Sequence, residues 1–232
     1  MDLKYTDILL DLDDTLIDTV ENTRLTLVEL YDEYHFSNYF PSFDDFYTIY
    51  YVNVSRLWEL YGRGQITKAM LHRERFIAPL NAVEEISDEQ ALAINDEFIK
   101  RVMKKGTLIA GAKELLDYLK SRYSLHILSN GFTEMQHVKI ESAGLTGYFD
   151  KIILSDEVGV NKPHPDLFSF ALKKIGADRD RIIMIGDNLF TDIGGAYNSG
   201  IDQIWYNPGH KPIQDFRPTY VVDKLSGIEG IL

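Results

Sequence analysis

Cysteine is absent from the chain of 232 residues, and this absence excludes two kinds of feature. No disulfide bond can form, and no metal ion can be held by thiolates, so any metal must bind oxygen or imidazole ligands. Long apolar runs are also absent: no stretch approaches the roughly 18 to 20 residues of a membrane-spanning helix. Residues 1–7 lack the basic-then-apolar pattern of a signal peptide. We therefore expect a cytoplasmic protein with no membrane partner.

Positive charge is scarce in this sequence. The chain has 24 Lys and Arg residues against 36 Asp and Glu residues, a formal net charge of −12, and no basic run. A nucleic-acid backbone binds to clustered positive charge, so the composition argues against a nucleic-acid partner. A small molecule that carries phosphate needs only one locally placed cation. The sequence is compatible with a monomer or a homodimer.

Apolar strands alternate with helical patterns in the second half of the chain. Strands are expected over 7–12, 125–128, 151–154, 182–185 and 203–205, and helices over 20–34, 43–61, 67–78, 87–104, 112–121, 133–143, 166–175 and 192–199. The alternation predicts an α/β fold, with a Rossmann-like three-layer core whose parallel sheet is covered by helices on both faces.

More than a hundred residues without strand character separate the first two strands. We therefore expect a core formed by 1–16 and 105–232, with an α-helical domain inserted over 17–104. Between Tyr31 and Tyr61 lie 12 of the 28 aromatic residues of the chain. Packing of the inserted domain's own core and of its contact with the sheet domain is the favoured explanation, and stacking of one or two rings on a flat ligand is the alternative.

The stretch ILLDLDDTLIDT over 8–19 ends an apolar strand with three aspartates, Asp11, Asp13 and Asp14. Grouped carboxylates repel one another and resist burial, so this arrangement is unfavourable unless a cation, a proton or bulk water relieves it. Further polar residues follow the other strands. They are Ser129, Asn130 and Gly131 after the second strand, Lys162 after the third, and Asp187 with Asp192 after the fourth.

Ligands of doubly wound sheets bind beyond the carboxyl ends of the strands, where all of these residues fall. An acidic cluster with a single Lys suits a hard divalent cation that bridges to a phosphate, with Asp11 and Asp187 as Mg²⁺ ligands. One carboxylate can attack phosphorus while its neighbour transfers the proton. Lys162 would neutralise the charge shared by phosphate and nucleophile.

Ser129 and the backbone amides around Asn130 and Gly131 are expected to hold phosphoryl oxygens at the start of the following helix. Taken singly, each motif also has a structural explanation: a turn, a helix cap or a surface lysine. The combination is more specific than its members, because order, spacing and position at strand ends agree.

The motif DLDDT, together with the later residues, resembles the haloacid dehalogenase superfamily of aspartate-nucleophile hydrolases over essentially the whole chain. The resemblance implies that Asp11 is the nucleophile and a metal ligand. It implies that Asp13 is the acid/base, whose backbone carbonyl also contacts Mg²⁺. Ser129 matches the second motif and Lys162 the third. The helical insertion resembles the cap domain of the family's first type, subfamily I.

The fourth motif of this family is matched by Asp187 and Asp192. The resemblance implies that Asp187 binds the metal and that Asp192, like Thr15 of the first motif, has a supporting role. Asp192 would act on the metal indirectly.

Three stretches look closest to pyrimidine 5′-nucleotidases: LWELYGRGQIT, SNGFTEMQ and TDIGGAYNSGIDQIWYNP. The implied function is Mg²⁺-dependent hydrolysis of a small phosphate monoester, a pyrimidine nucleoside 5′-monophosphate, through an aspartyl phosphate. Alternatives in the superfamily are a phosphoglycolate or sugar-phosphate phosphatase, a phosphomutase and a 2-haloacid dehalogenase. A phospho-accepting receiver domain, which is shorter and has no such insertion, and a binding protein without catalysis are alternatives from other classes.

Overall fold

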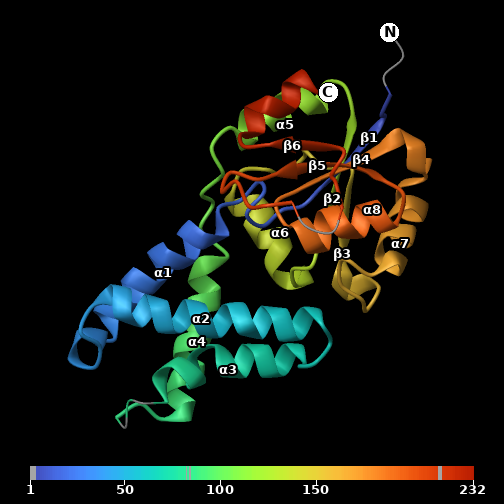
Figure 1. The fold of residues 1–232 in the computed structure, drawn as a ribbon. Coiled ribbons are helices and arrows are strands. Elements are labelled where there is room, and N and C mark those ends of the chain that lie inside the picture. The colour runs from blue at the N-terminus through green and yellow to red at the C-terminus, as the bar shows by residue number, and fades with distance from the viewer. Residues whose placement is uncertain (1–3, 82, 84, 214–215) are drawn as a thin grey trace. The chain divides into compact units, whose positions relative to one another are not determined.

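The computed structural model describes residues 4–81, 83, 85–213 and 216–232, and the chain divides into two compact units (Figure 1). The first unit comprises Met1–Thr19 and Gly106–Leu232, and the second comprises Val20–Lys105. The second unit therefore interrupts the first shortly after its first strand.

A parallel sheet forms the centre of the first unit. Within the described residues it has six strands, in the order β3-β2-β1-β4-β5-β6. The strands are β1 (Asp7–Leu10), β2 (Ser124–Ser129), β3 (Lys151–Leu154), β4 (Ile182–Gly186), β5 (Asp202–Tyr206) and β6 (Tyr220–Val222). Strand β1 lies between β2 and β4, with Leu10 paired to Ile127 on one side and to Ile185 on the other. This is the order of a doubly wound Rossmann-type sheet, which confirms the predicted fold class.

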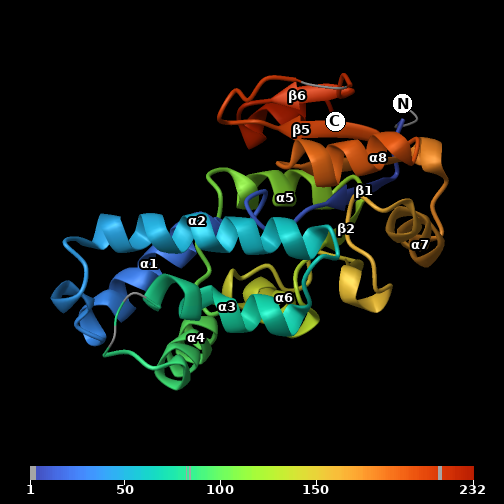
Figure 2. The same ribbon diagram turned by 60° about the horizontal axis from the view of Figure 1, so that its bottom comes forward.

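Helices cover both faces of this sheet (Figure 2). They are α5 (Ala112–Lys120), α6 (Thr133–Ser142), α7 (Pro165–Ile175) and α8 (Gly195–Asn198), followed by a 3₁₀ helix over Leu225–Gly230. Alternate residues of β1 pack on opposite faces: Ile8 lies in a core with α5, α6 and the 3₁₀ helix, and Leu9 lies in a core with α7 and α8. Burial on both faces explains the continuous apolar runs of the strands.

The elements expected from the sequence are present, and their limits differ from the expected ones by at most two residues apart from one helix. The first strand was predicted two residues too long, since it ends at Leu10 rather than Leu12. The backbone N–H of Asp11 nevertheless donates to the carbonyl of Ile185 at 2.9 Å, so pairing with β4 continues to the first aspartate.

The helix predicted over 192–199 begins three residues earlier, as a π-helical turn over Leu189–Gly194 that leads into α8. Asn188 causes this early start. Its side-chain Oδ1 accepts hydrogen bonds from the backbone N–H groups of Phe190 and Thr191, both at 3.0 Å, and so caps the turn.

The two chain segments that connect the units run side by side within the first unit. The backbone N–H of Asp18 donates to the carbonyl of Thr107 at 2.9 Å. Ile17 and Leu108 form an antiparallel bridge. The inserted segment therefore begins and ends at neighbouring points of the first unit.

The second unit is helical. Its helices are α1 (Thr19–Glu33), α2 (Phe43–Gly62), α3 (Lys68–Leu80) and α4 (Asp88–Val102). Side-chain oxygens of Ser42, Thr67 and Ser87 cap the starts of α2, α3 and α4, which explains where these helices begin. No helix in the described part of the chain is both long enough and apolar enough to cross a membrane.

Aromatic rings fill the interior of the second unit. Phe36 and Phe46 are fully buried, with ring centroids 5.0 Å apart. The ring of Tyr50 lies 5.2 Å from that of Phe76 and 5.7 Å from that of Phe98. This packing supports the favoured explanation of the aromatic stretch, in which these residues build the unit's own core.

Arg75 on α3 is an exception in this interior, because it is a cation with only 3% of its surface exposed. Its guanidinium carbon lies 5.6 Å from the ring centroid of Phe98. Its Nε and Nη1 atoms have no hydrogen-bond partner among the described residues. Burial lowers the pKa of Arg75 below its ordinary value, although Tyr50 opposes this shift. A buried charge without a counterion is energetically unfavourable.

Candidate active site

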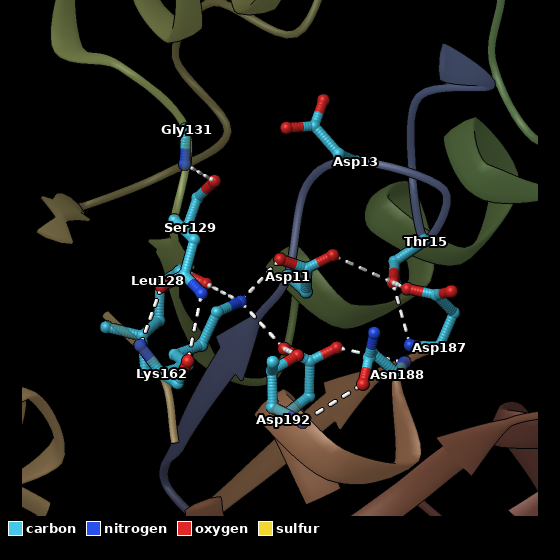
Figure 3. A network of polar contacts seen from close by, with 12 residues as sticks. Asp11, Asp13, Thr15, Leu128, Ser129, Gly131, Lys162, Asp187, Asn188 and Asp192 are labelled. Carbon is cyan, nitrogen blue, oxygen red and sulfur yellow. Dashed lines mark hydrogen bonds and ion pairs between the residues drawn. The ribbon is translucent and has the colours of Figure 1, made fainter. Parts of the chain in front are cut away.

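Three of the residues expected to carry chemistry lie at the carboxyl ends of three adjacent strands, and Lys162 and Asp192 reach the same place from loops and turns further along the chain (Figure 3). Asp11 follows β1, Ser129 ends β2, and Asp187 follows β4. The order β2-β1-β4 makes these strand ends neighbours. In a doubly wound sheet this edge is the place where ligands bind.

Lys162 joins two carboxylates in a buried ion cluster, defined as Asp11, Lys162 and Asp192. Its Nζ atom lies 2.6 Å from Oδ1 of Asp11 and 2.7 Å from Oδ1 of Asp192. A third hydrogen bond runs from Nζ to the backbone carbonyl of Leu128, at 2.7 Å. Burial alone would lower the pKa of Lys162, but the two carboxylates raise it above its ordinary value. The ammonium group therefore stays charged in the interior.

The carboxyl groups at this edge are held in an environment that disfavours their charge. Burial raises the pKa of Asp11 well above its ordinary value; Lys162 opposes the shift, and the charges of Asp192 and Asp187 add to it. Burial likewise raises the pKa of Asp187 to about 7, with smaller contributions from Asp192 and Asp14. A bound cation would stabilise these groups as anions.

Three of the carboxylates could hold such a cation. Asp11, Asp187 and Asp192 each offer one oxygen atom, and these atoms lie within 4.8 Å of one another. Carboxylate oxygens are the ligands that Mg²⁺ prefers, and a divalent cation would relieve the crowding of charge, so the donor set fits this ion. Asp192, expected to act indirectly, belongs to this group. The carboxylate of Asp13 instead points away from Asp11 (Figure 3), and contact of its backbone carbonyl with a metal stays a prediction.

Thr15 links the first and fourth motifs. Its hydroxyl lies 3.2 Å from Oδ2 of Asp11 and 3.4 Å from Oδ1 of Asp187, and it can donate to either carboxylate. The same oxygen accepts a hydrogen bond from the backbone N–H of Asp187 at 3.0 Å. The indole N–H of Trp205 donates to the carbonyl of Asp187 at 2.9 Å. The position of Asp187 is therefore fixed both from the turn after β1, through Thr15, and from β5, through Trp205.

Asp192 reaches the ion cluster because Gly186 leaves room for it. A Cβ atom at Gly186 would lie 2.6 Å from Cβ of Asp192, closer than two carbons can approach. The backbone N–H of Asn188 donates to Oδ2 of Asp192 at 3.1 Å, while Oδ1 contacts Lys162. Both oxygens of this buried carboxylate thus have partners.

The second motif is bonded to the third. Asn130 and Lys162 exchange two hydrogen bonds: the Asn130 amide donates to the Lys162 carbonyl at 3.1 Å and accepts from the Lys162 N–H at 2.7 Å. The hydroxyl of Ser129 accepts from the backbone N–H of Gly131 at 3.1 Å. The structure therefore places Ser129, Asn130 and Gly131 beside Lys162, and their binding of phosphate stays a prediction.

Residues 8–200 match the family model of haloacid dehalogenase-like hydrolases. The chain belongs to this family. The resemblance found in the sequence motifs is thereby confirmed, and the protein is an enzyme of the hydrolase class.

Two relatives of this hydrolase bear the name pyrimidine 5′-nucleotidase. YjjG of Escherichia coli K12 is 35% identical over 178 residues, which cover 76% of this chain and 77% of YjjG. PynA of Streptococcus pneumoniae R6 is 32% identical over 222 residues, which cover 94% of this chain and 91% of PynA. The expected similarity to nucleotidases is therefore found along most of the chain.

Two solved structures resemble this chain along nearly its whole length. The HAD-hydrolase YfnB of Bacillus subtilis, crystallised with magnesium bound, has a TM-score of 0.87 at 27% identity, with 99% of each chain covered. The L-2-haloacid dehalogenase of Xanthobacter autotrophicus has a TM-score of 0.75 at 20% identity, with 98% of each chain covered. The second likeness concerns the fold alone.

Sequence reasoning missed two residues that contact Asp13. The side-chain amide of Gln136 donates to Oδ2 of Asp13, and Nζ of Lys139 contacts Oδ1, both at 2.7 Å. Both residues come from α6, three positions apart and so on one helix face. A polar pair at this spacing, directly after Ser129 and its neighbours, was the available signal.

Proposed function

We propose that this hydrolase is a Mg²⁺-dependent phosphomonoesterase that forms an aspartyl phosphate on Asp11. The observation that carries the proposal is the buried contact of Lys162 with Asp11, beside the carboxylate of Asp187. A phosphoryl group at this edge would meet a nucleophilic oxygen and a fixed positive charge together. Such preorganised charge is the main protein contribution to phosphoryl transfer.

Asp11 and Asp187, with the backbone carbonyl of Asp13, would hold the magnesium ion, and Asp192 lies close enough to contribute an oxygen. The ion would neutralise charge on the phosphoryl oxygens when bound. The fixed ammonium group of Lys162 helps to keep Asp11 ionised in spite of its burial. Thr15, 3.2 Å from Oδ2 of Asp11, restricts rotation of the nucleophilic carboxylate.

The reaction proceeds in two steps. In the first, an oxygen of Asp11 forms a bond to phosphorus, the ester P–O bond breaks, and Asp13 gives a proton to the departing oxygen. In the second, Asp13 takes a proton from water, the water oxygen attacks phosphorus, and inorganic phosphate leaves with release of the Asp11 carboxylate. Lys162 stabilises the negative charge in both steps, and Ser129, Asn130 and Gly131 bind the phosphoryl oxygens.

Pyrimidine nucleoside 5′-monophosphates are the substrate class that we infer. The support is the name of the two relatives with 35% and 32% identity. The helical segment 17–104 would act as the cap domain that excludes water from the reaction, with 1–16 and 105–232 as the catalytic core.

The chemistry is tested with Asp11→Asn and with removal of divalent metal. Both changes should abolish release of phosphate from uridine and thymidine monophosphates, and Mg²⁺ should restore activity to the chelated wild type. The exposed residue Asp180 provides a matched control, since Asp180→Asn removes a carboxylate outside the site. A fully active Asp11→Asn protein would exclude the mechanism.

The substrate is tested separately with a panel of phosphate monoesters. Uridine and thymidine monophosphates should be hydrolysed with higher kcat/KM than phosphoglycolate and sugar phosphates. If phosphoglycolate is preferred by a wide margin, the nucleotidase assignment is wrong although the chemistry stands. Isomerisation of a sugar phosphate without phosphate release would indicate a phosphomutase, and release of halide from a 2-haloacid would indicate a dehalogenase.

A further inference from the structure

Helix α6 holds the side chain of Asp13 from one side with two residues. Oδ2 of Asp13 accepts a hydrogen bond from Nε2 of Gln136, and Oδ1 contacts Nζ of Lys139, both at 2.7 Å. Gln136 is completely buried, and the side chain of Lys139 is 13% exposed. Each oxygen of the Asp13 carboxylate therefore has its own donor, and the group cannot rotate without losing one of them.

Gln136 also binds Ser129. Its Nε2 atom donates a second hydrogen bond to the hydroxyl of Ser129, again at 2.7 Å. Both amide hydrogens are thus used, while Oε1 is buried without a partner in the part of the chain that the structure describes. The reversed orientation of the amide would place Oε1 against the Asp13 carboxylate, where two acceptors repel. The amide is therefore held by its donors, in spite of the unsatisfied oxygen.

Gly131 provides the space for this bridge. A Cβ atom at Gly131 would lie 2.8 Å from Cγ of Gln136 and closer still to its amide group. Because the backbone of Gly131 is not among the positive-φ positions, the requirement for glycine here is one of space and not of conformation. The absence of a side chain at Gly131 in the second motif therefore leaves room for the side chain of Gln136.

We propose that Gln136 and Lys139 are positioning residues that fix the carboxylate of Asp13 for its proton transfers. This inference rests on the proposed function of Asp13 as the acid/base. Their contacts leave a further lone pair on the Asp13 carboxylate, which can carry the proton that is donated to the departing oxygen and can later accept a proton from water. Through Ser129, Gln136 also ties the position of this carboxylate to a phosphate-binding residue. A displacement of about 1 Å at such a group is enough to slow a reaction about a hundredfold.

The test separates proton transfer from general loss of structure by comparing two substrates. When the ester P–O bond of a nucleotide breaks, the nucleoside leaves as an alkoxide that needs a proton, whereas p-nitrophenyl phosphate releases a stable phenolate that does not. For Gln136→Met and Lys139→Met, kcat for nucleotide should fall by about ten- to a hundredfold with little change in KM. The pre-steady-state burst of nitrophenolate should keep its wild-type rate, and only the later turnover of the phosphoenzyme should slow.

Two further variants complete the design. Lys139→Arg, which keeps a cationic donor, should recover more activity than Lys139→Met. His137→Met changes an exposed residue on the same helix and should match the wild type. If Gln136→Met does not fold, Lys139→Met alone tests the inference. Because the side chain of Lys139 is partly exposed, its replacement should leave the fold intact.

Equal loss of the burst and of nucleotide turnover would overturn the inference, since it indicates general loosening of the site. Wild-type kcat in both variants would also overturn it. Neither result would contradict the proposed function. That proposal is refuted by different results: an active Asp11→Asn variant, or a wild-type protein that hydrolyses no phosphate monoester.

Discussion

The raised pKa of Asp187 predicts that the apoprotein loses stability as the pH rises. Its pKa is about 7 in the folded chain, against an ordinary value of 3.8. Between these values the folded state binds more protons than the unfolded state, so the free energy of unfolding falls with increasing pH. The stabilising contribution is complete below the unfolded pKa and is lost as the pH passes the folded pKa.

The magnitude follows from the size of the shift. About pH 5 is about two units below the pKa of Asp187 in the folded chain. At about 1.36 kcal/mol per unit, Asp187 therefore contributes roughly 3 kcal/mol to the free energy of unfolding at this pH. By about pH 8 this contribution has disappeared. Other groups of the chain also contribute to the pH dependence of stability, so the informative quantity is the difference between wild type and Asp187→Asn.

Urea unfolding with a chelator present, repeated across this pH range, measures that difference. Relative to Asp187→Asn, the wild type should lose about 3 kcal/mol between the two ends of the range. If Mg²⁺ binds as proposed, saturating Mg²⁺ should reduce the loss, because it would bind the ionised carboxylates of the folded state. The exposed control Asp180→Asn should follow the wild type. Parallel pH profiles for wild type and Asp187→Asn would show that Asp187 titrates normally and would refute the reasoning from burial.

Arg75→Met should raise the free energy of unfolding by about 1 to 3 kcal/mol, because it replaces a buried cation, whose Nε and Nη1 have no hydrogen-bond partner among the described residues, with an apolar side chain of similar length. Chemical denaturation measures this, and a clear loss of stability would mean that Arg75 has a partner in solution. Gly186→Ala should lower kcat for hydrolysis of a nucleoside monophosphate at least about tenfold, because the added Cβ would displace Asp192 from Lys162. Gly62→Ala, where a Cβ meets no neighbouring atom within 4 Å, is the matched control, and equal kcat values for the two variants would show that the position of Asp192 is unimportant.

The sheet could be predicted because its strands are short apolar runs that end in polar residues. Asp11 and Asp187 follow such runs directly, so their arrival at one edge needed only the rule for parallel sheets. Strand β6 was missed, since three residues over Tyr220–Val222 give no periodic signal. The early helical turn after Asn188 was missed because a cap formed by a side chain inside the motif is not distinguishable from a loop residue in sequence.

The contacts of Asp13 could not be predicted for a different reason. The spacing of Gln136 and Lys139 shows that they share a face of α6, but not that this face turns toward the end of β1. Arg75 was unexpected because charged residues are rarely buried without a partner, so no sequence rule places one among aromatic rings.

The antiparallel bridge between Ile17 and Leu108 has an evolutionary consequence. The inserted segment begins and ends at two neighbouring, hydrogen-bonded stretches of the first unit. A helical insert of another length or sequence could therefore replace it without altering the connections between the strands. The sequence of the inserted segment can thus change in evolution while the strands that carry Asp11, Ser129 and Asp187 keep their order.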